Sequence, residues 1–552
     1  MSKFNSRGVR PVTGKSHITT TGPATNAEGG PGFVSDAKGE LFRLAVVNFV
    51  GENTFYESGA DRDARFNGLV RRVAVEDFEW LSGMLGWLRT GANMRSASLT
   101  GAAQAVQARI AAGEFDGNAD LIDSVLQRAD EPGEFLAYWQ SQFDPESLHG
   151  NRAMRLPQAV RKGLEKAVIR LYNERSFLKW DSAKRGVRFA DVIELIHPAP
   201  SAEWQGGLFW QGGLFKHILD DRHHGDATPY STLPVIEARA AWNAMSDQRK
   251  LAVVKSRGAS EALRAAGLTW ENVLSDLGGS ADKATLWNAI APTMGLMAVI
   301  RNLRNMDEAG IDRTVARNLA SRIADPAEVA KSRLLPFRFL SAYLAAPSDR
   351  WKQPLTDALE ESLKSVPELP GATLVLVDTS ASMSSMGYSA RSTVTPAMAG
   401  ALLGTVFASR QKGDLYGFAD GVFRHQSRRG EGVLAQTKSF VSRIGEVGHG
   451  TEMTSALRAT YKGHARVVIV SDMQCFADGG RYLSDGGWSS RGNPIPVPDN
   501  VPVYGINLGG GPVTAIDTRL RNRHEFAGLT DQVFAQMAAL EAGYNSRWPW
   551  EN

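Results

Sequence analysis

A change of pattern near residues 365–372 constrains what this chain can fold into. From about residue 40 to 350, apolar residues recur at helical spacing in segments that Gly, Pro and Asp interrupt. This pattern predicts stacked helix pairs of the solenoid kind. From residue 373, apolar strands such as TLVLVD and RVVIVSD alternate with helical segments. The alternation predicts a doubly wound, mostly parallel α/β sheet.

The first 38 residues follow neither pattern. They are rich in Ser, Thr, Gly, Pro and Asn and show almost no apolar periodicity, which predicts a disordered arm. The expected division is therefore an arm over 1–38, a helical-repeat module over 39–368 and an α/β domain over 369–552.

Composition limits the class of protein. Hydrophobic residues at 43% and charged residues at 22% are ordinary values for a folded globular protein. A single cysteine, Cys475, excludes an internal disulfide and favours a reducing compartment. No apolar run approaches the length of a membrane span, and the first residues lack the apolar core of a signal peptide. We therefore expect a cytoplasmic protein without membrane contact.

Hydroxyl and carboxylate side chains gather where the predicted strands end. Asp378 closes the first strand, and Ser380 and Ser382 follow at alternate positions, so all three point the same way if the loop is extended. Asp472 closes a later strand, and Thr451 precedes a predicted helix. Ligands of open α/β sheets bind beyond the carboxyl ends of the strands. Two carboxylates and three hydroxyls there suit a magnesium-type cation.

Catalytic interpretations of the same residues are weaker. An aspartyl-phosphate enzyme needs a second acid two positions after its nucleophile, and Ser380 stands there. A serine hydrolase needs an activating histidine, and the sharp G-x-S-x-G turn is absent. Cys475 is expected to be a small buried side chain. We therefore expect a binding protein and not an enzyme.

Positive charge is concentrated between residues 152 and 188, where eleven basic residues stand against three acidic ones. Lys162, Lys166 and Arg170 repeat at i, i+4 and i+8 on one face of a predicted helix. Such a row predicts a surface for a polyanion. The alternative is an ordinary solvated helix face.

The α/β part resembles a von Willebrand factor A domain. The likeness rests on the Asp378-x-Ser380-x-Ser382 segment, the Gly450-Thr451 loop and Asp472, which match the family's metal-ion-dependent adhesion site in order and position. It implies that these residues hold Mg²⁺ or another divalent cation. It also implies an open coordination position for an acidic group of a partner.

Five segments of the helical part resemble the module shared by telomerase-associated, Ro and vault proteins. They are FVGENTFYE at 49–57, VIELIHPAPS at 192–201, GGLFKHILD at 212–220, WNAIAPTMGLMAVIRNLRNM at 287–306 and SRLLPFRFLSAY at 332–343. Followed by an A domain, they are similar to the Ro autoantigen family and its bacterial orthologues over about residues 40–550. This resemblance implies a HEAT-like helical ring that the A domain closes.

The Ro resemblance also implies partners. A ring of this family takes single-stranded ends of misfolded or decaying RNAs in its hole and holds a small noncoding Y RNA on an outer basic face. It implies a monomer that acts in RNA quality control or as an adaptor to an exoribonuclease such as polynucleotide phosphorylase. The segment WDSAKRGVRFADVIELIH resembles the family's RNA-binding segment, although Trp180 stands where a basic residue is frequent. By this match the RNA-binding residues are Lys184, Arg185 and His197, with Lys179 and Arg188 close by.

Two alternatives remain at this level. His197 precedes Pro198 and fits a residue that merely ends a helix. The whole chain also fits a protein-binding scaffold without an RNA role, in which the metal site receives an acidic partner and the basic window only keeps the protein in solution.

Overall fold

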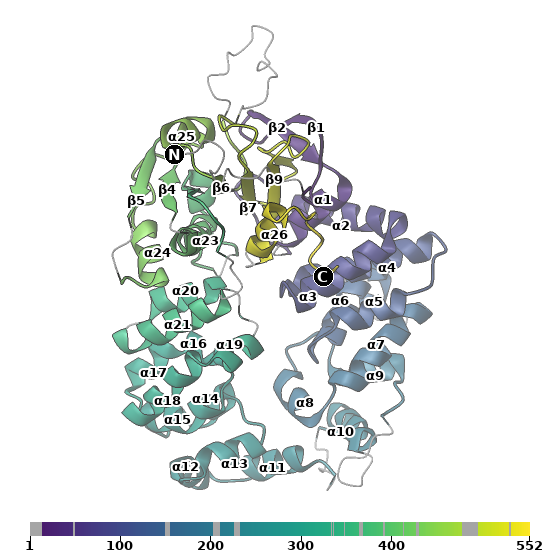
Figure 1. Ribbon diagram of the computed structural model, residues 1–552. Coiled ribbons are helices and arrows are strands. Elements are labelled where there is room, and N and C mark those ends of the chain that lie inside the picture. Colours follow the sequence, from purple (N-terminus) through teal and green to yellow (C-terminus); the bar gives the residue numbers. More distant parts are fainter. Residues whose placement is uncertain are drawn as a thin grey trace. The chain divides into compact units, whose positions relative to one another are not determined.

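The computed structural model describes residues 14–47, 50–149, 155–201, 210–225, 232–332, 334, 336–346, 348–363, 368–389, 392–411, 413–426, 430–476, 495–528 and 532–551. The chain divides into two compact units. The sheet unit takes its described residues from Met1–Ala97, Arg333–Ala345 and Leu355–Asn552, and the helical unit from Ser98–Ser332 and Ala346–Pro354. Figure 1 labels most helices and strands of both units, where there is room.

The helical unit consists of successive short helices, as the apolar periodicity predicts. Its helices are α4 (Arg95–Ala111, which begins in the sheet unit), α5 (Asn118–Val125), α6 (Glu131–Phe143), η1 (Pro145–His149), α7 (Gln158–Leu171), α8 (Glu174–Trp180), α9 (Phe189–Ile196), α10 (Trp210–His224), α11 (Pro234–Asn243), α12 (Asp247–Lys255), α13 (Ala259–Ala265), α14 (Trp270–Leu277), α15 (Lys283–Ile290), η2 (Ala291–Thr293), α16 (Leu296–Arg301), α17 (Leu303–Ala309), α18 (Arg313–Ile323), α19 (Pro326–Ser332) and η3 (Asp349–Trp351).

Helix α7 illustrates how the sequence positions these helices. Its buried stripe of Val160, Leu164 and Val168 recurs every four residues and faces the interior. The helix lies so close to α5 that a Cβ at Gly163 would come within 2.6 Å of the Ile122 Cβ. The opposite face of α7 is thereby left for charged side chains.

The sheet unit contains the predicted α/β domain and more. Its helices are α1 (Ala37–Ala45), α2 (Gly59–Glu76), α3 (Phe78–Thr90), α20 (Pro336–Ala345), α21 (Lys352–Ser362), α22 (Ala381–Ser384), α23 (Pro396–Gln411), α24 (Val433–Val441), α25 (Met453–Thr460) and α26 (Gln532–Glu541). Its strands are β1 (Thr20–Thr25), β2 (Pro31–Ser35), β3 (Thr373–Asp378), β4 (Asp414–Phe418), β5 (Val422–His425), β6 (Arg466–Ser471), β7 (Val503–Asn507), β8 (Val513–Thr514) and β9 (Arg523–Ala527).

Among the described strands, six form a sheet in the order β5-β4-β3-β6-β7-β9, and β1, β2 and β8 form a separate three-stranded sheet. All neighbours pair in parallel except β4 and the edge strand β5. Strand β3 is buried along its whole length, as a strand covered on both faces must be. Helix α23 packs so tightly on one face that a Cβ at Gly404 would lie 2.5 Å from Val377 Cγ2. Leu457 of α25 belongs to the core on the sheet with Leu374 and Leu376. The predicted doubly wound sheet is confirmed.

The disordered arm predicted over 1–38 is wrong for residues 20–35. Strands β1 and β2 pair antiparallel, and β2 also pairs with β8 of the sheet unit. The polar side chains that suggested disorder find partners far along the chain. The Thr20 hydroxyl donates to Asp517 Oδ1 at 2.9 Å, and the Asn26 amide donates to the Cys475 carbonyl at 2.7 Å. Composition alone cannot reveal such distant acceptors.

The expected boundary at residue 39 also differs from the structure, because residues up to Ala97 belong to the sheet unit. Arg43 of α1 forms a fully buried ion pair with Glu525 of β9, at 2.9 Å. Its guanidinium also donates to the carbonyl groups of Gly511 and Pro512. These partners lie more than 460 residues away in sequence, which hides the association from a pattern of local periodicity.

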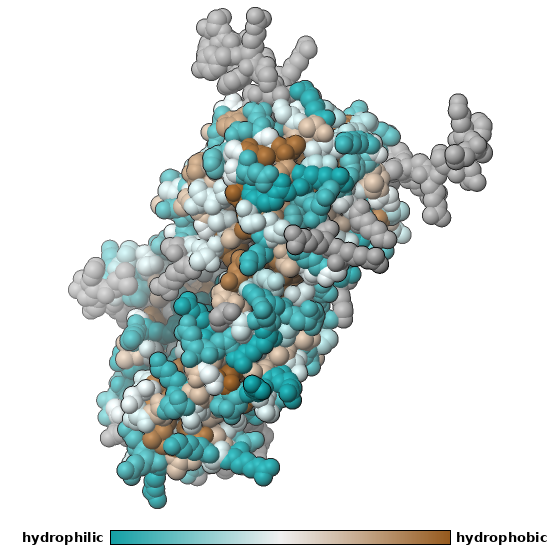
Figure 2. All heavy atoms as spheres, turned by 90° about the vertical axis from the view of Figure 1, so that its left-hand side faces the viewer, coloured by the Kyte–Doolittle hydropathy of each residue, from teal (hydrophilic) through white to brown (hydrophobic). Residues whose placement is uncertain are grey.

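One face of the molecule carries mostly polar side chains. On the face drawn in Figure 2, hydrophilic residues predominate and hydrophobic ones form small areas between them. Among the described residues we find no helix with the length and apolar character that a bilayer crossing requires.

Candidate metal centre and nucleic-acid interface

The five residues predicted to bind a cation lie on three loops at the carboxyl edge of the sheet. Asp378 ends β3, and Asp472 directly follows β6, the parallel neighbour of β3. The Ala381 amide donates to the His449 carbonyl at 2.9 Å, which draws the loop of Thr451 against the segment after β3. All five predicted ligands are buried, with exposed fractions of 8% or less.

Hydrogen bonds connect three of the five predicted ligands, Asp378, Ser380 and Ser382. The Ser380 amide donates to Asp378 Oδ1 at 2.9 Å, and the Ser380 and Ser382 hydroxyl oxygens lie 3.2 Å apart. Asp472 lies in the same buried place, because the charge of Asp378 acts on its carboxylate. The other Asp378 oxygen accepts the Ser471 hydroxyl at 2.6 Å. The structure thus brings two carboxylates and two hydroxyls into one cluster.

The carboxylates of this cluster carry unfavourable charge. Burial raises the pKa of Asp378 above its ordinary value. Burial also raises the pKa of Asp472, and the neighbouring charge of Asp378 raises it further. Within the part of the chain that the structure describes, neither carboxylate forms an ion pair with Lys, Arg or His. A cation between them would therefore be strongly attracted.

The donor set fits a hard cation. Carboxylate and hydroxyl oxygens are the ligands that Mg²⁺ accepts, and Mg²⁺ needs few of them because it retains water. Across the described ranges, no group of three or more His, Cys, Asp or Glu side chains is arranged to hold a metal ion. The five predicted ligands offer only oxygen donors, with no histidine or cysteine, which suits magnesium better than a zinc-type ion, and occupancy by magnesium stays a prediction.

Two supporting residues escaped the sequence analysis. Asp420 follows β4 and accepts the His449 and Gly450 amides, each at 3.0 Å, which fixes the Thr451 loop. Ser471, the last residue of β6, holds Asp378. The sequence did contain a signal for Asp420. The segment DLYGFAD is a third predicted strand, and an acidic residue follows its carboxyl end, as in the other two strands.

Cys475 is buried beside this edge, as the sequence predicts. Burial raises the pKa of its thiol well above the ordinary value, which leaves the sulfur protonated and unreactive.

A cavity of about 410 Å³ opens beside the cluster within the sheet unit. Ser382 and Asp472 line it from the sheet edge, and Ala27, Tyr56 and Gln474 line it from neighbouring segments. Residues 52–57, part of the segment 49–57 that the Ro resemblance singled out, thus contribute to the wall of this cavity.

The basic row of α7 is exposed as predicted, but most of it is paired. Lys166 forms an ion pair with Asp120 at 2.5 Å, and Arg170 forms one with Asp123 at 2.6 Å. Both acids belong to α5, which packs against α7. Lys162 is exposed and has no ion pair among the described residues. Exposed ion pairs of this kind contribute little to stability, so a phosphate can compete for the same cations.

A second group of cations surrounds Trp180, at the end of α8. The Arg128 guanidinium lies 4.3 Å from the centre of the indole ring, and the Lys179 ammonium lies 4.7 Å from it. Arg128 and Arg185 share the buried carboxylate of Asp130, at 2.5 and 2.9 Å. We call these four residues, Arg128, Lys179, Trp180 and Arg185, together with the exposed Lys184 that precedes Arg185 in sequence, the Trp180 cluster.

The remaining predicted RNA ligands have structural partners. Arg188 is engaged by Asp181 and lies 3.5 Å from Asp221. Its side chain is only 18% exposed, so it has little surface for a ligand. His197 has a φ of 48° and ends α9, where its amide donates to the Ile193 carbonyl at 2.8 Å. The helix-ending role is confirmed for its backbone, while its imidazole remains exposed.

Comparisons with known proteins agree with this architecture. Residues 258–370 match the TROVE domain. The crystal structure of the Deinococcus radiodurans Ro (RSR) protein covers 92% of this chain and 100% of its own, with a TM-score of 0.57 and 16% identity. This chain has the fold of a Ro protein. No curated protein matches it. The comparisons confirm the resemblance to the Ro family and the predicted order of a helical part before a sheet domain, and the Trp180 cluster precedes the TROVE match.

Proposed function

We propose that the helical unit binds RNA and that the Trp180 cluster is its principal contact. The observation that carries this proposal is the arrangement of cations around one indole ring. Arg128, from the segment before α6, and Lys179 of α8 lie over the ring, Arg185 shares Asp130 with Arg128, and the exposed Lys184 adjoins Arg185 in sequence. Phosphates are bound by Lys and Arg, and unstacked bases by aromatic rings.

The buried Asp130 explains why this cluster suits phosphate. Its side chain is inaccessible to a ligand, and it holds Arg128 and Arg185 in place. Four cations stand against Asp130 and Glu134, which leaves two positive charges. Guanidinium groups fixed in advance lose less freedom when they form paired hydrogen bonds with a phosphate.

The TROVE match and the Ro fold support a more specific role. We infer that the ligands are a small noncoding RNA of the Y type and the single-stranded ends of misfolded or decaying RNAs. The protein then acts as a cytoplasmic RNA-binding adaptor to an exoribonuclease such as polynucleotide phosphorylase, and it does not itself catalyse a reaction. Closure of a monomeric helical ring by the A-type domain stays a prediction.

We propose in addition that Asp378, Ser380, Ser382, Thr451 and Asp472 hold Mg²⁺. The support is the buried excess of negative charge at the sheet edge and the oxygen-only donor set. Bound there, the ion would offer a coordination position to an acidic group.

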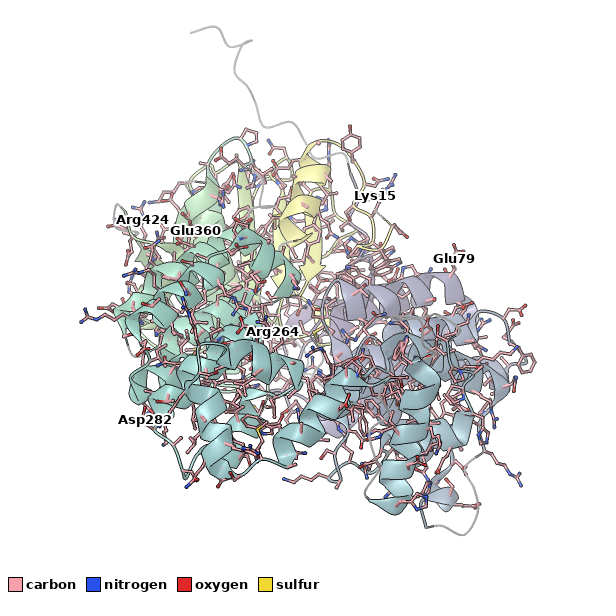
Figure 3. The ribbon with its side chains drawn as sticks, turned by 90° about the horizontal axis from the view of Figure 1, so that it is seen from below. Lys15, Glu79, Arg264, Asp282, Glu360 and Arg424 are labelled. Atoms are coloured by element: carbon pink, nitrogen blue, oxygen red, sulfur yellow. The ribbon has the colours of Figure 1, made fainter. Side chains whose placement is uncertain are left out.

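A charge-reversal experiment tests RNA binding. Lys179→Glu combined with Lys184→Glu changes two exposed residues without disturbing Asp130, and the matched control is Lys255→Glu with Lys283→Glu on α12 and α15. Lys283 adjoins Asp282, which Figure 3 labels. Filter binding of a structured RNA across salt concentrations should show weaker binding and a shallower salt dependence for the first pair only. Equal effects of both pairs would place the interface elsewhere.

The competing function is a protein-binding scaffold, which the cavity beside the proposed metal site favours. The ratio of absorbance at 260 and 280 nm after purification distinguishes the two. Copurified RNA supports the RNA-binding function, and its absence together with no RNA affinity supports the scaffold.

A further inference from the structure

A cation in the wall of the cavity beside the sheet edge has no carboxylate in contact with it. Arg62 lies in the first turn of α2, is 4% exposed and lines this cavity. Its Nη2 donates to the Val47 carbonyl at 3.1 Å, whereas its Nε is buried and has no hydrogen-bond partner. Among the described residues, Arg62 forms no ion pair. Its guanidinium therefore brings donors into the cavity that the protein leaves partly unused.

Arg65, almost one turn further along α2, has the opposite environment. It forms ion pairs with Glu40 at 3.0 Å and with Glu57 at 2.8 Å, and it also donates to the Gly510 carbonyl at 3.0 Å. Burial lowers the pKa of Arg62 to about 10, which leaves this arginine charged at neutral pH. Because a buried charge without a partner lowers stability, packing alone does not account for Arg62.

The segment that precedes α2 gives the cavity a defined wall. The Asn53 side-chain oxygen accepts the Gly59 amide at 2.7 Å, and the Thr54 amide donates to the Glu57 carbonyl at 2.9 Å. These bonds close residues 53–59 into a compact loop that carries Phe55. A wall built in advance loses little conformational freedom when a ligand binds.

The same cavity presents apolar surface to solvent. Phe55 and Met386 line it and are 47% and 37% exposed, while Met383 and Leu508 line it from buried positions. Its volume of about 410 Å³ is in the range of sites for small molecules. An apolar surface and an unpaired guanidinium in one cavity suit a molecule that combines an apolar body with an anionic group.

We propose that this cavity binds a small organic acid, whose carboxylate contacts Arg62 and whose apolar body packs against Phe55 and Met386. A carboxylate suits the site better than a phosphate, because one guanidinium balances one negative charge and a dianion is costlier to remove from water. This inference goes beyond RNA binding and does not depend on an ion at the sheet edge.

The position of Asp472 determines how such an acid is oriented. Two consecutive glycines after β7 lie against the two charged groups. A Cβ at Gly509 would come within 2.6 Å of the Asp472 Cβ, and a Cβ at Gly510 would come within 3.1 Å of the Arg62 Nη2. Like charges repel, so the carboxylate of the ligand is directed toward Arg62 and away from Asp472.

Methyl NMR of the full-length protein, labelled with ¹³C at the methionine methyl groups, tests binding and its place. The probes are 4-phenylbutyrate and its neutral amide, 4-phenylbutyramide, which have nearly the same shape. The acid should shift the signals of Met383 and Met386, and the signal of Met537 in α26 should stay unchanged. The amide should bind about 10-fold more weakly, because it lacks the charge that strengthens a hydrogen bond to guanidinium.

Titration calorimetry with the same probes tests the role of Arg62. Arg62→Met should weaken binding of the acid about 10-fold, leave binding of the amide unchanged and not lower the melting temperature of the free protein, since it removes an unpaired buried charge. The matched control is Arg72→Met in the same helix, an exposed residue paired with Glu76. This control should bind both probes like the unaltered protein. Phe55→Ala, a change at an exposed position, should weaken binding of both probes.

Four results would overturn the proposal. They are equal affinity for the acid and the amide, unchanged binding of the acid by Arg62→Met, no shift of either cavity methionine at about 1 mM acid, and a loss in Arg62→Met that occurs with Mg²⁺ but not in a chelator. The last result would assign the carboxylate to the ion. RNA binding by the Trp180 cluster and Mg²⁺ binding at the sheet edge depend on other residues and would stand in each case.

Discussion

The two polar sites of this molecule arrange charge in opposite ways. At the sheet edge, Asp378 and Asp472 are buried together without an ion pair in the described residues. Around Trp180, every arginine has a carboxylate partner and the group remains partly exposed. The buried site is short of positive charge, whereas the exposed site has a small excess of it.

The difference indicates what each site can bind. A buried cluster in a low dielectric attracts a small ion strongly and is little affected by salt. An exposed cluster gains less from each contact, and its affinity depends on many phosphates and on counterion release. Charge content alone does not distinguish the two, because burial decides how strongly each charge acts.

Removal of one buried carboxylate should give the largest effect. Asp378→Ala is expected to weaken Mg²⁺ binding by more than 100-fold, or about 2.7 kcal/mol, while RNA affinity stays within twofold. Calorimetry with Mg²⁺ and filter binding with RNA measure the two quantities. An unchanged calorimetric isotherm would remove the contrast between the sites.

Salt should separate the sites almost as clearly. If the four cations of the Trp180 cluster each contact a phosphate, raising salt from about 50 to 200 mM lowers RNA affinity roughly 100-fold. Mg²⁺ binding at the buried cluster should change far less over the same interval. Equal salt dependence of the two affinities would contradict the proposed difference in exposure.

Acid should weaken the sheet unit. Burial, followed by the charge of Arg523, lowers the pKa of His524 to about 4. Because the unfolded chain binds this proton more readily, stability is complete above about pH 6.5 and is lost as pH falls toward 4. Chemical denaturation should show a loss of about 2 kcal/mol between pH 7 and 5. His524→Phe should reduce this loss, and an unaltered pH profile would assign the acid sensitivity to other groups.

The aromatic part of the exposed site should have a smaller effect. Trp180→Ala is expected to weaken binding of single-stranded RNA by about 10-fold, because stacking on one ring contributes roughly 1–3 kcal/mol. Trp180→Phe should retain part of the affinity. If both variants bind like the unaltered protein, the ring serves only to pack Arg128 and Lys179.

Paired cations should contribute least. Lys166→Ala removes a cation that Asp120 already neutralises, whereas Lys162→Ala removes one without an ion pair in the described residues. RNA affinity should fall more for Lys162→Ala, and the difference should disappear when Asp120→Ala is added. A larger effect of Lys166→Ala alone would mean that RNA displaces Asp120.

Local patterns predicted much of this molecule. The alternation of apolar runs and helical segments was sufficient for the sheet, since each strand must be covered on both faces. The strand ends were sufficient to bring Asp378 and Asp472 to one edge, because parallel strands share their carboxyl edge. These inferences need only residues that are close in sequence or related by simple topology.

Local sequence patterns could not predict the contacts between residues that are far apart in the chain. The hairpin of residues 20–35 is ordered by acceptors such as Asp517 and the Cys475 carbonyl, which no local signal announces. The basic window likewise gave no sign that Asp120, Asp123 and Asp130 from earlier helices would neutralise part of it. Pairing across distant segments depends on the finished fold.

The buried pair of Arg43 and Glu525 has a consequence for biosynthesis. The ribosome synthesises Arg43 482 residues before Glu525. The ion pair between them can therefore form only when almost the whole chain has been translated. The helical unit, whose contacts are nearer in sequence, can collapse while still tethered to the ribosome, since N-terminal-first folding during synthesis requires only nearby partners. The sheet unit can therefore be completed only after residue 525 has been synthesised, and until then the Arg43 guanidinium is hydrated by water and not paired with Glu525.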